Sequence, residues 1–409
     1  MSTSNLSARL SVMMFLQFFI WGAWYTTIAV YMSNHDMQTL THWPYTVNPL
    51  AAIVAPFFLG LIADRYFATE KVLGVLHLLG GAFMFLVPQV SANPVLFIVL
   101  LAAYNLCYMP TLGLSNSLAF HHITDQEKQF PLIRVFGTIG WIVAGLAISF
   151  VLSGMVSGAA EATALPLYMA AGASIVLGFY SFSLPNTPPA AKGKPVSISS
   201  IVGVDAFRQL GSRAFYVFLA ASFLLCIPLA AYYNFTQLFL EASGVERIAA
   251  TQTLGQMSEV VFMLLMPFFF RRLGVKWMLV VGMGAWVLRY VLFALAAPAG
   301  VFWMIVIGIL LHGICYDFFF VTGQIYVDKK STPEIRGQAQ GMLVLITYGA
   351  GMFIGAQVAG NVFNALLGGA EALSATQWQE FWYLPALFAG AILLFFVFTF
   401  KDEVDRSTT

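Results

Sequence analysis

Apolar runs of membrane-spanning length dominate this chain of 409 residues. An α-helix needs about 20 apolar residues to cross the hydrocarbon core of a bilayer. Runs of that kind recur along the whole sequence, separated by short polar breaks. Hydrophobic residues make up 60% of the chain and charged residues only 9%, whereas about a quarter of the residues in a soluble domain are charged. The sequence therefore predicts an all-α polytopic membrane protein.

The apolar runs form two sets of six. The predicted spans cover residues 8–32, 44–63, 71–90, 94–120, 131–153, 164–184, 214–240, 249–270, 276–297, 301–327, 334–366 and 380–400. The segment 185–200 between the sets is rich in Pro, Ser and Lys, which is typical of a linker. We therefore expect an N-terminal six-helix bundle over 1–184 and a C-terminal six-helix bundle over 213–402. A cytoplasmic linker over 185–212 that could form a short amphipathic helix joins them, and 403–409 is a cytoplasmic tail.

The orientation of the chain follows from its Lys and Arg residues. With the N-terminus inside, 17 of the 19 basic residues fall on the cytoplasmic side. The exceptions are Arg247 in an outer loop and Arg289 within a span. Cytoplasmic loops carry an excess of Lys and Arg, so we expect both termini to be cytoplasmic. The three cysteines, Cys107, Cys226 and Cys315, all lie in apolar segments, and their spacing indicates neither disulfides nor a metal site.

Three charged residues lie deep within predicted spans: Glu259, Arg289 and Asp317. Counting about 1.5 Å per helical residue from the cytoplasmic charges places all three near the middle of the membrane. A carboxylate there is costly and commonly marks a path for protons or substrate. We expect Asp317 and Glu259 to couple transport to protons. The alternative is a structural ion pair between Arg289 and one of the two acids.

Polar and aromatic side chains share helix faces near these charges. Gln256 lies three residues before Glu259, His312 lies four residues before Tyr316, and residues three or four apart share a face. The span that opens at Pro131 places Arg134, Thr138 and Trp141 along one face, although an Arg at a helix start is also a common membrane-surface anchor. Another stripe holds Gln17, Trp21 and Trp24. Amides beside aromatic rings suit a planar, uncharged, hydrogen-bonding solute.

Eight segments resemble one known family in the same order along nearly the whole chain. They read FLQFFIWGAWYTT, GLIADRYF, YMPTLGLSNS, FPLIRVFGTIGW, GQMSEVVFMLLMPFF, LRYVLFA, YDFFFVTGQIYVDKK and IRGQAQGM. Together they are similar to the nucleoside:proton symporters of the major facilitator superfamily. GLIADRYF resembles the start of that superfamily's loop signature after helix 2. Asp64 and Arg65 would then form a conformational latch, rather than a simple charged flank.

The resemblance implies a major facilitator fold of twelve transmembrane helices and inward transport of nucleosides driven by the proton gradient. It assigns substrate binding to Arg134, Thr138, Gln256, Glu259 and Tyr316, with Trp141 beside them, and proton coupling to Asp317. His312 stands where the family has Tyr, and we expect it to contact the solute. Ala230 and Tyr233 stand where the family offers amides, with Asn234 and Gln237 nearby. These two departures leave the exact solute open.

The expected protein is a symporter and not an enzyme. It would lie in the cytoplasmic membrane as a monomer, with a nucleoside, protons and the lipid bilayer as partners and with no nucleic acid, cofactor or metal. A proton-coupled transporter of a sugar or another small neutral solute is the alternative within the same fold. A membrane enzyme or a non-transporting receptor is the alternative from another class.

Overall fold

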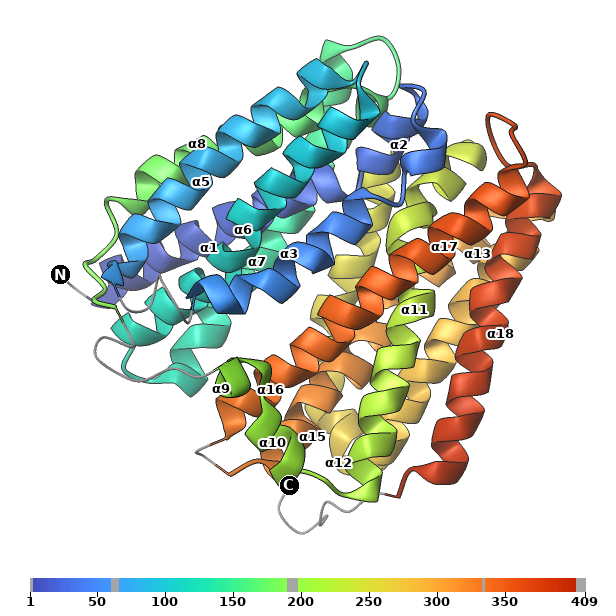
Figure 1. Ribbon diagram of the computed structural model, residues 1–409. Coiled ribbons are helices and arrows are strands. Elements are labelled where there is room, and N and C mark those ends of the chain that lie inside the picture. Colours follow the sequence, from blue (N-terminus) through green and yellow to red (C-terminus); the bar gives the residue numbers. More distant parts are fainter. Residues whose placement is uncertain (1–2, 60–65, 190–197, 333–334, 402–409) are drawn as a thin grey trace. The chain divides into compact units, whose positions relative to one another are not determined.

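The computed structural model describes residues 3–59, 66–189, 198–332 and 335–401, and within them every regular element is a helix. Contacts divide the chain into two compact units (Figure 1). Unit 1 consists of residues 1–196 together with Glu246–Thr253, and unit 2 of residues 197–245 and 254–409. Asp64, Arg65 and the predicted tail 403–409 lie outside the described residues.

Unit 1 contains seven α-helices in its described part. They are α1 (Thr3–Tyr25), α2 (Ile28–Ser33), α3 (Pro44–Phe58), α5 (Thr69–Leu86), α6 (Pro94–His122), α7 (Gln126–Leu146) and α8 (Leu165–Ser181). Helix α1 packs against α7 and α8, while α5 lies between α6 and α8 and α3 packs on α6 (Figure 1). A π-helical turn, Ala147–Val151, follows α7 directly. This packing places α7, which carries Arg134, against α1.

Unit 2 contains the remaining helices, some of them interrupted. They are α9 (Ile198–Val202), α10 (Val204–Gln209), α11 (Arg213–Ala242), α12 (Ile248–Ala299), α13 (Phe302–Leu310), α14 (His312–Cys315), α15 (Thr322–Lys330), α16 (Arg336–Val344), α17 (Met352–Leu367) and α18 (Ala375–Thr399). Two π-helical segments, Tyr316–Val321 and Leu345–Gly351, join α14 to α15 and α16 to α17. Helix α11 packs against α17 and α18, and the short helices α9 and α10 pack against α16.

The spans predicted from hydropathy coincide with these helices. Nine helical segments of the described chain are long and apolar enough to cross a membrane. One of them, α12, holds two predicted spans, which Gly274 separates with a φ of 66° and a non-helical ψ of 179°. A side chain rarely adopts that backbone conformation, so glycine suits the break. The two further predicted spans correspond to α8, which is shorter but apolar, and to α3.

Polar caps fix where several of these helices begin. Asn93, Ser212 and Ser374 each accept a hydrogen bond from a backbone N–H of the first turn of α6, α11 and α18. Such caps satisfy N–H groups that have no partner within the helix, and each stabilises its helix by about 1 kcal/mol. The helix boundaries that hydropathy leaves uncertain are therefore set by single polar residues.

The first turn of α12 belongs to unit 1, because a buried carboxylate holds it there. Glu161 is fully buried and its Oε1 accepts hydrogen bonds from Ser149 Oγ at 2.7 Å and from the N–H of Ala249 at 3.1 Å. Ser149 Oγ in turn accepts from the N–H of Ala250 at 3.0 Å. A carboxylate at a helix N-terminus is favourable for the helix dipole. These bonds explain why Glu246–Thr253 groups with unit 1.

Candidate functional site

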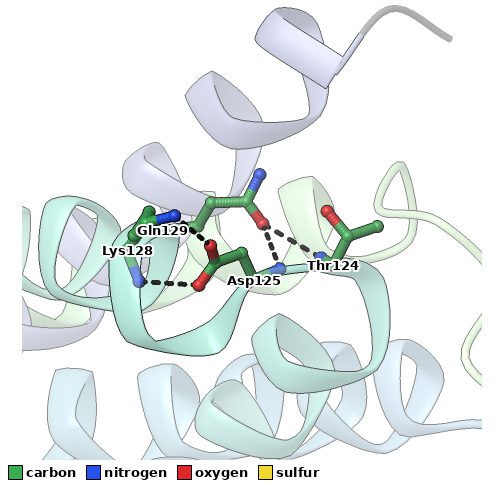
Figure 2. Close-up of polar contacts among 4 residues, drawn as sticks. All are labelled: Thr124, Asp125, Lys128 and Gln129. Atoms are coloured by element: carbon green, nitrogen blue, oxygen red, sulfur yellow. Dashed lines mark hydrogen bonds and ion pairs between the residues drawn. The ribbon is translucent and has the colours of Figure 1, made fainter.

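Helix α7 begins at a charged cap that lies nine residues before Arg134. The carboxylate of Asp125 accepts from the N–H of Lys128 at 3.1 Å and forms an ion pair with its ammonium group at 3.2 Å. Gln129 Oε1 accepts from the N–H groups of Thr124 and Asp125 at 2.9 and 3.1 Å (Figure 2). Together these bonds satisfy several N–H groups at the start of α7. The cap thereby fixes the register of the helix that presents Arg134, Thr138 and Trp141.

The face of α7 that carries these residues packs closely on α1. A Cβ atom on Gly140 would lie 2.2 Å from the carbonyl oxygen of Phe15, and one on Gly22 would lie 3.0 Å from the Trp141 ring. Only glycine allows backbones to approach this closely. The guanidinium carbon of Arg134 lies 4.0 Å from the centroid of the Phe18 ring, which is a cation–π contact. Arg134, Thr138 and Trp141 are all partly buried.

An aromatic cluster extends from Trp141 into unit 1. The Trp141 ring lies edge-on to Trp21 and Tyr25, with centroids 5.6 and 6.1 Å apart. Trp21 also contacts Tyr108 edge-on at 5.9 Å. This is the geometry that aromatic pairs prefer. The stripe predicted on the first helix therefore meets the predicted substrate residue Trp141 on α7.

A buried hydrogen-bond network lies next to this aromatic cluster. Gln17 Nε2 donates to Thr111 Oγ1 at 2.7 Å, and Gln17 Oε1 lies 2.9 Å from His77 Nε2. His77 Nδ1 lies 3.2 Å from Ser174 Oγ. The sequence analysis singled out Gln17 but not His77 or Ser174. Neither residue carries a periodic signal, because each is a single polar residue in an apolar run.

In unit 2, His312 lies beside Glu259. His312 Nε2 is 4.0 Å from Glu259 Oε2. The His312 ring stacks on Tyr232 of α11 at 5.6 Å and on Tyr316 at 6.0 Å, and it meets Tyr233 edge-on at 6.1 Å. His312 is buried, whereas Glu259 and Gln256 are partly buried. The structure thus brings together the predicted residues Glu259, His312 and Tyr316, and it adds Tyr232, which the sequence analysis did not select.

Ala230 and Tyr233, which stand on α11 where the family offers amides, have different surroundings. Tyr233 contacts the His312 ring. Ala230 faces α17 instead, because a Cβ atom on Gly355 would lie 2.7 Å from the Ala230 methyl carbon. Asn234 and Gln237 are fully buried, and Gln237 Nε2 donates to the carbonyl oxygen of Tyr233. On this helix the aromatic side chains of Tyr232 and Tyr233 lie against His312.

Asp317 lies in the π-helical segment Tyr316–Val321 and is fully buried. Its backbone carbonyl oxygen accepts from the N–H of Thr322 and from Thr322 Oγ1 at 3.3 Å. Among the described residues, neither oxygen of its carboxyl group has a hydrogen-bond partner. π-Helical turns inside α-helices are rare and frequently occur at functional sites. A buried carboxyl group without a partner suits reversible protonation far better than a static structural role.

Arg289 does not form the ion pair that the structural alternative requires. It is fully buried, its Nε donates to the carbonyl oxygen of Gly308 at 2.9 Å, and its guanidinium carbon lies 3.9 Å from the centroid of the Tyr232 ring. Among the described residues no ion pair joins Arg289 to Glu259 or Asp317. Instead, the guanidinium group is directed to a backbone carbonyl and an aromatic face.

Comparisons with known proteins give the family. The sequence profile described as "Nucleoside H+ symporter" matches residues 4–405. The chain is 38% identical over 407 residues to the putative nucleoside transporter YegT of Escherichia coli, covering 98% of this chain and 95% of that protein. It is 31% identical over 424 residues to the nucleoside permease NupG of Escherichia coli, covering 99% and 98% of the two chains.

A solved structure gives the fold. The crystal structure of the nucleoside transporter NupG superposes with a TM-score of 0.84 at 30% identity, covering 98% of this chain and 100% of that chain. Family and structure agree with the resemblance found in the sequence, and these relatives are transporters, not enzymes. The chain therefore belongs to the nucleoside H⁺ symporter family: it is a multi-pass membrane protein with the major facilitator fold that imports nucleosides together with protons.

Proposed function

We propose that Asp317 is the proton carrier and that the nucleoside is bound by Arg134, Thr138, Trp141, Gln256, Glu259, His312 and Tyr316. The observation that carries this proposal is the burial of the Asp317 carboxyl group without a hydrogen-bond partner among the described residues. Glu259 lies on the neighbouring helix, where it faces His312. In a nucleoside H⁺ symporter, such a carboxyl group takes up a proton when substrate binds and releases it when the site opens inward. Glu259 is the second candidate for proton coupling.

The chemistry of a nucleoside fits the residues proposed to bind it. The base is a flat ring with hydrogen-bonding edges, and Trp141 and Tyr316 offer aromatic faces for stacking. The ribose hydroxyls are donors and acceptors, which Arg134, Thr138, Gln256 and Glu259 can satisfy. His312 adds an imidazole beside Glu259.

The remaining features of the proposal concern the whole chain. The excess of basic residues in one set of loops supports cytoplasmic termini and a location in the cytoplasmic membrane. The two six-helix bundles, 1–184 and 213–402, would be joined by the linker 185–212, and Asp64 and Arg65 would form a conformational latch at the end of the second predicted span. We propose a monomer that needs no cofactor and uses only the proton gradient.

Uptake into proteoliposomes tests the function. The purified protein should accumulate labelled uridine when the lumen is more alkaline than the medium, and a protonophore should abolish the accumulation. Competition by unlabelled nucleosides, nucleobases and sugars then identifies the solute. Competition by a sugar but by no nucleoside would refute the proposed substrate. The variant Arg134→Lys tests the binding site. It keeps the charge but loses the planar guanidinium group, and we expect it to raise KM by about tenfold.

A further inference from the structure

The transmembrane segment that carries His312 and Asp317 is interrupted next to both residues. Helix α13 ends at Leu310, α14 begins at His312, and the π-helical segment begins at Tyr316. Two carbonyl groups just before His312 accept hydrogen bonds from side chains of α12. Arg289 Nε donates to the carbonyl oxygen of Gly308 at 2.9 Å, and Ser258 Oγ donates to that of Leu310 at 2.5 Å. Helices bend where a side chain enters the backbone hydrogen-bond ladder.

Both donors are fixed by their surroundings. Arg289 is fully buried and Ser258 is 7% exposed. A Cβ atom on Gly313 would lie 2.6 Å from the backbone carbonyl group of Ser258, and one on Gly255 would lie 3.1 Å from His312 Cβ. The backbones of α12 and α14 are therefore in direct contact, as in helix pairs with small residues at the interface. A shift of the carbonyls at Gly308 and Leu310 would move His312 with them.

Arg289 also reaches His312 through an aromatic ring. Its guanidinium carbon lies 3.9 Å from the Tyr232 centroid, and Tyr232 stacks on the His312 ring at an interplanar angle of 18°. His312 also stacks on Tyr316 and lies beside Glu259. The same arginine therefore donates to the carbonyl oxygen of Gly308 and lies against the Tyr232 ring on which His312 stacks.

We propose that Ser258 and Arg289 are positioning residues for nucleoside binding. They hold the interrupted helix at Leu310 and Gly308 and thereby set the direction in which His312 faces Glu259. This inference rests on the proposed role of His312 and Glu259 in binding the nucleoside. It assigns no contact with the solute to Ser258 or Arg289, and it gives Arg289 a role through its Nε–H donor instead of through its charge.

Paired substitutions at Arg289 separate the donor from the charge. In Arg289→Gln the amide nitrogen is the same number of bonds from Cα as Nε of arginine, so the donor to Gly308 remains while the charge is lost. Arg289→Met loses both. At equal amounts of folded protein, we expect Arg289→Met to raise KM for uridine by roughly fivefold. A change of that size corresponds to the loss of about one hydrogen bond. Vmax should change less than KM, and the KM of Arg289→Gln should stay near that of the parent protein. Equal losses in both variants would overturn the proposal.

Substitutions at Ser258 test the second bond. Ser258→Ala should raise KM by roughly fivefold, as expected for one lost hydrogen bond. Ser258→Thr keeps the hydroxyl group, so its KM should lie close to the parental value. Ser222→Ala is the matched control, because Ser222 is 1% exposed and its hydroxyl has no hydrogen-bond partner among the described residues. In a His312→Ala background, Ser258→Ala should have little further effect on KM. A full additional effect there would show that Ser258 does not act through His312.

A chemical readout makes the inference independent of the substrate. Cys315 lies on α14 and is 1% exposed. In a chain with Cys107→Ala and Cys226→Ala, maleimide labelling of Cys315 should be several times faster with Arg289→Met or Ser258→Ala, but not with Arg289→Gln. If this pattern appears while the parent takes up no nucleoside, the proposed function fails and the positioning role stands. Uptake with unchanged KM and unchanged labelling in the variants would refute the positioning role alone.

Discussion

The imidazole of His312 faces the carboxylate of Glu259, with Nε2 and Oε2 4.0 Å apart. This pair combines the acid that the family resemblance assigns to the substrate with a residue that departs from the family pattern. Tyr232 of α11 stacks on the imidazole ring, and Tyr233 meets it edge-on. The position of His312 therefore makes it the strongest candidate for what distinguishes the specificity of this protein from that of its relatives.

Replacing His312 by Tyr should change which nucleosides are preferred. The Tyr ring can keep the stack on Tyr232, but a longer hydroxyl group replaces the imidazole nitrogen beside Glu259. We expect the order of competition among nucleosides to change while Vmax for the best one stays within about threefold, because the substitution keeps an aromatic ring beside Tyr232. Competition assays with a panel of nucleosides measure this order. An unchanged order would show that His312 does not read the solute.

Asp317→Asn should abolish accumulation driven by a pH gradient. The amide has nearly the shape of the carboxyl group but cannot exchange a proton, so the variant should still exchange labelled for unlabelled uridine across the membrane. Counterflow and gradient-driven uptake in the same proteoliposomes distinguish these activities. Asp205→Asn is a suitable control, because Asp205 is an exposed residue of α10. Accumulation at the parental level in Asp317→Asn would assign Asp317 a structural role.

Gly140→Ala should destabilise unit 1. The added methyl group would lie 2.2 Å from the carbonyl oxygen of Phe15, so α1 and α7 must separate. Overpacking of this kind typically costs about 1–3 kcal/mol. Gly284→Ala is the matched control, since no atom lies within 4 Å of its Cβ position. Melting temperatures in detergent should fall by several degrees for the first variant and stay level or rise for the second.

His42 should make the folded protein sensitive to acid. It lies between the first two predicted spans and is 6% exposed, and burial lowers its pKa from 6.5 to about 4. Between those values the unfolded chain binds more protons than the folded one, so stability falls as the pH drops from 6.5 towards 4. Replacement by Phe should flatten this part of a plot of melting temperature against pH. A slope equal to that of the parent would show that His42 does not contribute.

The helices could be predicted from the sequence because length and hydropathy are local properties. The run 301–327, for example, needs only its own residues to be recognised as a span. Glu259 and Asp317 could be selected in the same way, because a charge within an apolar run is rare. Their neighbours were harder to foresee, because Tyr232 meets His312 only through the packing of α11 against another helix.

Contacts that depend on the backbone were not predicted at all. Ser258 was not selected, since one hydroxyl in an apolar helix has no distinctive pattern, although Gly255 and Ser258 three residues apart do form a small-residue face. The partner of Arg289 could not be foreseen for the same reason: it is the carbonyl oxygen of Gly308, and a carbonyl group is present at every residue.

The π-helical segment Tyr316–Val321 has a consequence for how this protein is compared with others. Such a turn accommodates one additional residue within an α-helix. Because the wider turn takes up the additional residue, deleting one residue there would restore regular α-helix and leave the residues on both sides on their present faces, whereas a deletion elsewhere in the span would rotate one side by about 100° relative to the other. A homologue that is one residue shorter in this segment would therefore still present its counterparts of His312 and Lys330 on the same faces. An alignment gap is structurally neutral within Tyr316–Val321 and disruptive outside it.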